Sequence, residues 1–195
     1  MVVKTIRAPF GPADIILDKG LPTEYRFDGK ENLQFEGGEV TLEPQYADIG
    51  SIDLGGGNYD QYVTHFEGTV VISGFEDSLE NFALALGGLQ EITDAENGVI
   101  GYSDAPIGAS NRERSRTVTI SPRYLMGDTG AEHIHIYKAA SNASYTRAYG
   151  LEQGQVAIEM AIYPKDGADP AQGDNFFRRG SIEAMPENDP VDPGV

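Results

Sequence analysis

The chain has 195 residues and a formal net charge of −17, and it contains neither Cys nor Trp. This charge argues against tight binding to a nucleic-acid backbone or to an anionic membrane, because both require a basic surface. The absence of Cys excludes disulfides, thiolate metal sites and a cysteine nucleophile, while 24 Gly and 11 Pro favour a loop-rich β domain.

Residues 1–12 are expected to form an extended N-terminal arm. Pro9 and Pro12 separate this arm from an apolar stretch at 13–17, which is predicted to be the first strand. The arm carries no apolar segment typical of a signal peptide, so synthesis in a cytoplasm is expected. We therefore predict a folded β domain at 13–185.

Strands are predicted at 33–43, where a Gly pair marks a turn or a bulge, and at 65–73. Side chains of a strand point alternately to its two faces. This alternation turns the apolar residues of both segments toward the core and places Glu39, Glu43 and Glu67 on the opposite face.

The segment 44–62 between these strands is predicted to be a long loop. It contains Gly50 and the run Gly55–Gly57, and it has no convincing strand period. Loops longer than about 12 to 15 residues in a compact domain are usually functional or disordered. We therefore expect this loop to have a function.

One convincing helix is predicted, from Asp77 to Leu86. Asp77 is expected to be the N-cap, Glu80 to complete a capping box, and Gly87 to end the helix. A helix of about three turns must pack on a sheet to be stable. The apolar residues predicted to face that sheet are Phe75, Leu79, Phe82 and Leu86.

Further strands are predicted in the second half of the chain. Asn97-Gly98 is a hairpin signal, and the clearest alternation, at 155–163, places Glu159 on the solvent face. The Pro-rich acidic tail at 186–195 is expected to be disordered. The other predicted strands are 116–120, 132–137, 143–147 and 176–182.

These elements predict a mainly β protein: a two-sheet β-sandwich or barrel flanked by one short α-helix, with a long loop and extended termini. The length of the chain allows one domain with a sizeable core. No repeat of 20 to 50 residues stands out, which argues against a solenoid or a propeller.

The sequence has few signs of catalytic chemistry. His133 and His135 are two residues apart on a predicted strand, so they share a face and could bind a metal together with His65. No phosphate-binding loop, nucleophile elbow or catalytic triad is indicated. We predict a protein that is not an enzyme and has no cofactor, and we keep the histidine metal site as a rival hypothesis.

The order strand, long loop, strand, helix resembles the major tail tube protein of long-tailed, siphovirus-like bacteriophages, which is related in fold to the tube protein of type VI secretion systems. The resemblance is a pattern of elements rather than a catalytic signature. It is carried by Gly38–Pro44, the loop that ends near Tyr62, Phe66–Gly74 and Glu76–Leu86, and more weakly by Val156–Tyr163 and Phe176–Gly180.

The resemblance implies a structural subunit of the virion tail, assembled in the host cytoplasm. Such subunits form hexameric rings that stack into a hollow tube through which DNA leaves the capsid without tight binding. The implied partners are further copies of the chain and the tape measure, tip and terminator proteins of the tail.

The resemblance also assigns roles to residues. The loop 44–62 matches the ring-stacking loop, which is expected to become ordered on assembly. Its candidate contacts are Tyr46, Ile49, Ile52, Leu54 and Tyr59. The carboxylates expected to line the lumen, where negative charge repels DNA phosphates, are Glu39, Glu43, Glu67 and Glu159.

The main alternative is a monomeric β-sandwich recognition module that binds a glycan or a receptor through Tyr-rich loops. Such a module needs no ring. Its acidity would then reflect a solvated surface or a saline habitat rather than the passage of DNA.

Overall fold

The computed structural model describes residues 11–96, 98–125, 132–147, 149 and 154–181. Most of the predicted N-terminal arm and the whole predicted tail at 186–195 lie outside these residues. The strands are β1 (Ala13–Leu17), β2 (Tyr25–Phe27), β3 (Gln34–Gly50), β4 (Asn58–Gly74), β5 (Gln90–Asp94), β6 (Gly98–Ser103), β7 (Arg116–Pro122), β8 (Ile134–Ser141), β9 (Val156–Tyr163) and β10 (Phe177–Arg179). The helical elements are α1 (Leu79–Leu86) and the 3-10 turns η1 (Ile52–Leu54) and η2 (Arg123–Leu125).

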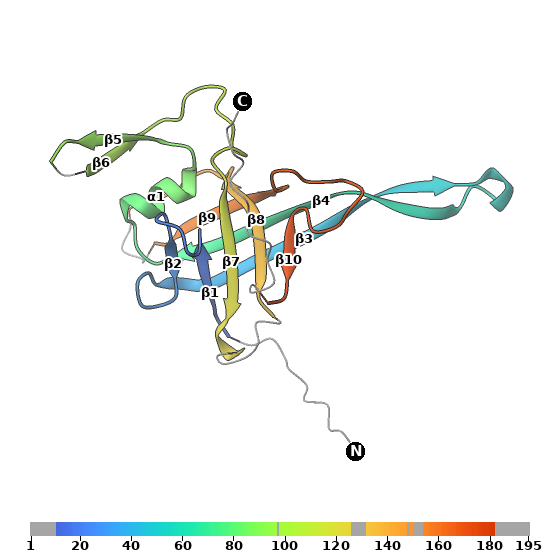
Figure 1. The fold of residues 1–195 in the computed structure, drawn as a ribbon, viewed down its shortest axis with the longest axis horizontal. Coiled ribbons are helices and arrows are strands. Elements are labelled where there is room, and N and C mark those ends of the chain that lie inside the picture. The colour runs from blue at the N-terminus through green and yellow to red at the C-terminus, as the bar shows by residue number, and fades with distance from the viewer. Residues whose placement is uncertain (1–10, 97, 126–131, 148, 150–153, 182–195) are drawn as a thin grey trace, which may run out of the picture.

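The main sheet is antiparallel and has the order β2-β1-β7-β8-β9-β4-β3 (Figure 1). Two strands pair with successive parts of β8, because β10 pairs with residues 134–136 and β9 with residues 138–141. The strands β5 and β6 form a separate hairpin. Their pairing confirms the hairpin signal at Asn97-Gly98, although Asn97 itself is not described.

The two ends of the main sheet enclose one core. Its buried side chains come from β1 and β2 at one end, from β4 and β9 toward the other, from β7 and β8 between them, and from α1. The Nε2 group of Gln34 on β3 connects the ends by donating hydrogen bonds to the carbonyls of Ala13, at 2.8 Å, and Phe27, at 2.6 Å. Gly38 lies so close to Ile15 that a Cβ at this position would overlap the Ile15 side chain. The predicted β-sandwich or barrel with one short helix is therefore confirmed.

The predicted ends of the helix were partly wrong. The N-cap is Ser78 rather than Asp77: its hydroxyl accepts a hydrogen bond from the Asn81 backbone N–H at 3.1 Å. Gly87 ends the helix as predicted, with φ of 65° and its N–H donating to the Ala83 carbonyl. Asp77 instead pairs with Arg147, beyond β8.

The predicted core face of the helix was also partly wrong. Phe75 and Leu79 are 41% and 47% exposed, while Phe82 and Leu86 are half-buried. The most buried residues of the helix are Asn81, Leu84 and Ala85. A buried Asn in the middle of this face rotates the helix away from the orientation that apolar periodicity predicts.

The segment 143–147 is not a strand, contrary to the prediction. The segment forms a loop, in which the Tyr145 ring packs edge-on against Phe82 with 4.9 Å between ring centroids. The Tyr145 hydroxyl donates to Asp77 at 2.9 Å. The predicted strand 176–182 is confirmed only in its central part, as β10.

Candidate assembly surfaces

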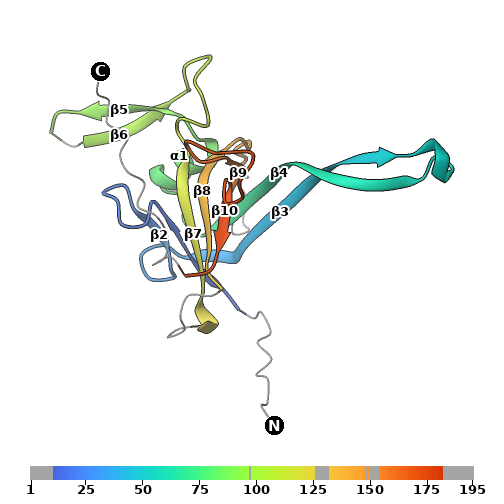
Figure 2. The same ribbon diagram turned by 45° about the vertical axis from the view of Figure 1, so that its right-hand side comes forward.

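The segment 44–62 is a β-hairpin rather than a loop. β3 and β4 pair from Glu43 opposite Glu67 to Gly50 opposite Asn58, and the chain reverses through η1 and two left-handed glycines. This distal hairpin, residues 45–64, extends away from the body of the molecule in both ribbon views (Figures 1 and 2). The prediction that this segment gains its structure only on assembly is therefore wrong for the single chain.

The strand pattern of the distal hairpin is hidden because neither of its faces is covered by the core. Alternation of apolar and polar residues marks a strand only where one face is buried. Irregular pairing at Gln45/Tyr46 and at Ile49/Gly50 further shifts the phase of the pattern. The apolar residues of the distal hairpin therefore show no period of two in the sequence.

The distal hairpin exposes large apolar side chains on both faces. Tyr46 lies opposite Val63 on one face, and Ile49 and Tyr62 lie on the other. The same surface carries a polar cluster in which Asp48 accepts hydrogen bonds from Asn58 and Gln61. The exposed fractions are Tyr46 53%, Ile49 41%, Ile52 93%, Tyr59 69%, Tyr62 57% and Val63 52%. The side chain of the fifth predicted contact, Leu54, is not described.

The four predicted lumen carboxylates share one face of the sheet. Glu39 and Glu159 flank Val71 of β4 from its two sides, and Glu43 lies directly opposite Glu67. All four are exposed, and the alternate residues of the same strands point into the core. The prediction that they face away from the core is confirmed. We call this surface the acidic face.

A charge pattern along the chain was missed in the sequence prediction. Residues 31–111 contain no Lys and no Arg, while Asp and Glu recur throughout this segment. It includes β3, β4, α1, β5 and β6, so the acidic charge of the two hairpins is not neutralised locally. The positions of Lys and Arg along the sequence reveal this pattern, whereas the net charge of the whole chain does not.

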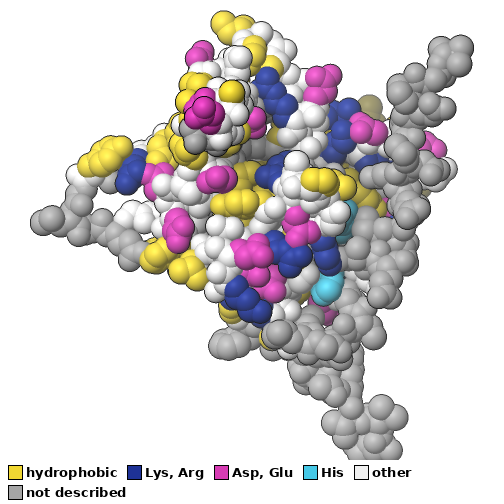
Figure 3. Space-filling model, turned by 60° about the vertical axis from the view of Figure 1, so that its left-hand side comes forward, with side chains coloured by type: hydrophobic (Ala, Val, Ile, Leu, Met, Phe, Trp, Pro, Cys, Tyr) yellow, Lys and Arg dark blue, Asp and Glu magenta, His cyan; other side chains and the backbone are white. Residues whose placement is uncertain are grey.

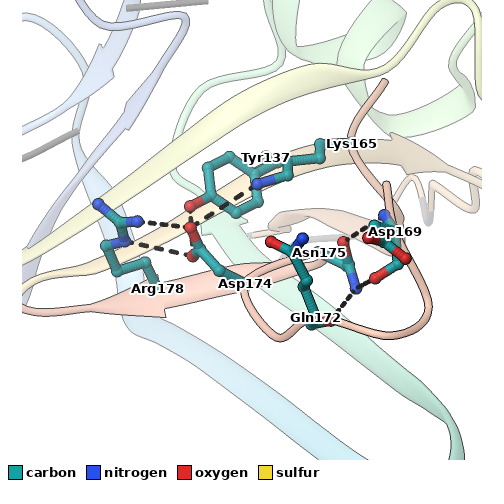
Figure 4. A network of polar contacts seen from close by, with 7 residues as sticks. All are labelled: Tyr137, Lys165, Asp169, Gln172, Asp174, Asn175 and Arg178. Carbon is teal, nitrogen blue, oxygen red and sulfur yellow. Dashed lines mark hydrogen bonds and ion pairs between the residues drawn. The ribbon is translucent and has the colours of Figure 1, made fainter. Parts of the chain in front are cut away.

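A polar cluster ties the loop after β9 to β8 (Figure 4). The Tyr137 hydroxyl donates to Asp174 at 2.5 Å, and Arg178 also pairs with Asp174. Burial and the hydrogen bond with Asp174 raise the pKa of Tyr137 to about 12. Burial raises the pKa of Asp174, but hydrogen bonds from Arg178 and Tyr137 outweigh this effect and lower it overall.

The loop after β9 also packs against the β3–β4 hairpin where it leaves the body of the molecule. The Phe66 ring of β4 packs against Phe176 and Phe177, with centroid distances of 6.0 and 5.7 Å. Lys138 and Arg112 both pair with Asp166 in this loop. The direction in which the hairpin leaves the body is therefore held by packed aromatic rings and by a loop that is itself fastened to the sheet.

The three histidines do not form a common site in the described part of the chain. His65 is exposed on β4 and contacts Thr64 and Glu67. His135 is half-buried on β8, where its Nδ1 lies 3.0 Å from the Thr119 hydroxyl and burial lowers its pKa. Within the described residues, no group of three or more His, Asp or Glu side chains could hold a metal ion. His133 has interactions of its own just before β8.

No known protein family matches this chain, and no curated protein does either. None of the helices in the described ranges is long and apolar enough to cross a membrane.

Proposed function

We propose that this chain is a structural subunit of the tail tube of a long-tailed bacteriophage, forming hexameric rings that stack into a conduit for DNA. The observation that carries the proposal is the distal hairpin, which exposes apolar side chains on both faces. A two-stranded hairpin is marginally stable in water, and exposed apolar surface of this kind marks an interaction site. Contact with a neighbouring ring would cover it.

The acidic face supports the same proposal. Like charges placed directly opposite each other destabilise a sheet, so the repulsion between Glu43 and Glu67 opposes the fold of the single chain, although Glu67 also contacts Gln45 and His65. A negative channel wall repels DNA phosphates, and in a narrow lumen this repulsion acts even though salt screens it over about 8 Å. The acidic face then prevents DNA from adhering during its passage.

The edges of the main sheet also favour assembly. β3, with 17 residues, is the last strand at one end of the sheet, and β2, with three residues, is the last strand at the other. Exposed strand edges carry unpaired backbone groups and tend to pair with other chains. Joining the sheets of six subunits around a ring removes these edges from solvent.

The partners that follow from this role are further copies of the chain and the tape measure, tip and terminator proteins. The site of action is the virion tail after assembly in the host cytoplasm. In this role the subunit performs no catalysis and requires no cofactor.

The test shortens the hairpin. Replacing residues 46–64 by Asn-Gly joins Gln45 and His65 through a tight turn that suits paired strands. Sedimentation of the concentrated wild-type protein should give hexamers of the 21.0 kDa subunit and longer stacks, whereas the shortened variant should stop at single rings. Circular dichroism and thermal melting check that the variant remains folded. Stacks of equal length from both proteins, or monomers from both, would contradict the proposal.

A further inference from the structure

A groove lies beside the point where the described part of the chain begins. Its wall is formed by residues 11–12, by the start of β3 and by parts of β4 and β9. Its volume of about 590 Å³ is within the range of pockets that bind ligands. We call this surface, with Gly11, Glu36, Glu39, Val71 and Ala157 in its lining, the acidic groove.

The acidic groove carries negative charge that the described residues do not neutralise. Glu36 and Glu39 are exposed in it, and neither forms a salt bridge within the described part of the chain. Glu39 accepts a hydrogen bond from the Thr41 hydroxyl at 3.4 Å, which leaves its charge in place. Glu159 adds a third carboxylate on the other side of Val71. A segment that is complementary to the groove is therefore basic.

A cation at the edge of the groove is already paired. The Arg123 backbone N–H donates to the Pro12 carbonyl, but the guanidinium of Arg123 forms a salt bridge with Asp14. On the face of the molecule drawn in Figure 3, Lys and Arg also lie among Asp and Glu. The described part of the chain therefore offers few Lys or Arg side chains that could neutralise the groove.

Residues 1–10 have the composition that fits this groove. Lys4 and Arg7 are the only Lys and Arg outside the described residues, and no Asp or Glu occurs before Asp14. Most of the other side chains in residues 1–10 are apolar, and they can cover the partly exposed Val71. The distal hairpin and the tail at 186–195 are acidic, so the groove repels both.

Residues 1–10 are joined directly to the wall of the groove. They lead into Gly11, whose φ of 89° turns the chain away from the extended course of β1. Lys4 is seven residues from Gly11 in the sequence, so it can reach any point within about 24 Å of it. This attachment gives residues 1–10 an effective concentration on the order of millimolar at the groove, which favours them over the same residues of a second copy.

We infer that residues 1–10 dock in the acidic groove of their own copy. Lys4 and Arg7 then lie near the carboxylates of the groove, and the apolar side chains of residues 1–10 cover its apolar part. Complementarity of charge and burial of apolar side chains both favour this contact. Docking covers the Glu39 end of the acidic face and leaves the Glu43–Glu67 pair exposed. The contact forms within one copy, so it does not depend on the proposed tube.

The absence of native Cys allows a direct test by cross-linking within the chain. Thr5→Cys is combined with Ala157→Cys, and the control protein combines Thr5→Cys with Ala171→Cys. Ala171 is an exposed Ala beside Asp169 in the loop after β9, so the control tests whether any acidic surface attracts residues 1–10. On oxidation, the Ala157→Cys protein should form an intramolecular disulfide about tenfold faster than the control, at a rate independent of protein concentration. Equal rates, or disulfides mainly between copies, would overturn the inference.

Charge reversal tests the basis of the contact in the same Thr5→Cys and Ala157→Cys protein. Adding Glu36→Lys and Glu39→Lys should slow the disulfide by about fivefold or more, because Lys4 and Arg7 then face positive charge. Glu43→Lys, on the acidic face but outside the groove, should leave the rate unchanged. All three carboxylates are exposed, and circular dichroism with thermal melting checks that each variant remains folded. Equal slowing by both changes, or none by either, would contradict docking through the groove carboxylates.

Discussion

Asn81 joins α1 to the rest of the molecule through its buried amide. Its Nδ2 donates to the Glu76 carbonyl at 2.7 Å, and its Oδ1 accepts from the Tyr25 hydroxyl at 3.1 Å. The side chain is only 1% exposed, which explains why the helix presents a different face to the sheet than its apolar residues predict. Asn in a helix interior is usually a surface residue, so no sequence pattern indicates this position.

Replacing Asn81 should cost far more than replacing an exposed Asn. Asn81→Ala removes the hydrogen bonds of its buried amide with the Glu76 carbonyl and the Tyr25 hydroxyl, and we expect the free energy of unfolding to fall by ~1–3 kcal/mol. Asn58→Ala removes an exposed hydrogen bond to Asp48 and should change it by less than ~0.5 kcal/mol. Urea denaturation of both variants measures the difference. Equal losses would show that the Asn81 contacts contribute little.

Tyr137 should make stability depend on alkaline pH. Its pKa is about 12 in the folded protein and about 10 in the unfolded chain, so the folded state binds this proton more tightly. The resulting stabilisation is present below pH 10 and is lost as the pH rises toward 12. Between pH 9 and 11.5 the wild-type protein should therefore lose more stability than Tyr137→Phe in denaturant titrations. Parallel losses would contradict the assignment.

At the scale of elements, the sequence predicts best where one face of a strand is buried. The strand at 155–163 was found almost residue for residue, because its inward residues are apolar and most of its outward residues are polar or small. The strand at 13–17 was found from its apolar run, in which Ile15, Ile16 and Leu17 are all buried. The distal hairpin was taken for a loop because both of its faces are exposed. Four of the five candidate contacts on it, Tyr46, Ile49, Ile52 and Tyr59, are exposed, while their role in stacking stays a prediction.

The repulsion between Glu43 and Glu67 should lower the stability of the β3–β4 hairpin. Glu43→Gln removes the repulsion with Glu67, and we expect it to raise the free energy of unfolding by ~0.2–1 kcal/mol at low salt. The gain should shrink in high salt, which screens exposed charges. Glu36→Gln is the matched control on β3, because Glu36 has no paired residue on β4. A control variant that gains as much would contradict the pairwise repulsion.

At the scale of the whole molecule, charge and exposed apolar surface are distributed unevenly. The segment 31–111 holds both hairpins and the helix with no Lys or Arg, whereas all the described Lys and Arg lie in the rest of the chain, on strands and in loops. The sequence contains this pattern in full, but its meaning depends on the fold, in which the distal hairpin extends away from the body of the molecule (Figures 1 and 2). A subunit of this kind is suited to contacts that repeat from copy to copy.

The measurement that tests the central claim most directly is negative-stain electron microscopy of the purified, concentrated wild-type protein. Hollow rings with six-fold symmetry, and tubes made of stacked rings, are expected. Particles that remain monomeric at every protein concentration and salt concentration would contradict it, and would favour the monomeric recognition module instead.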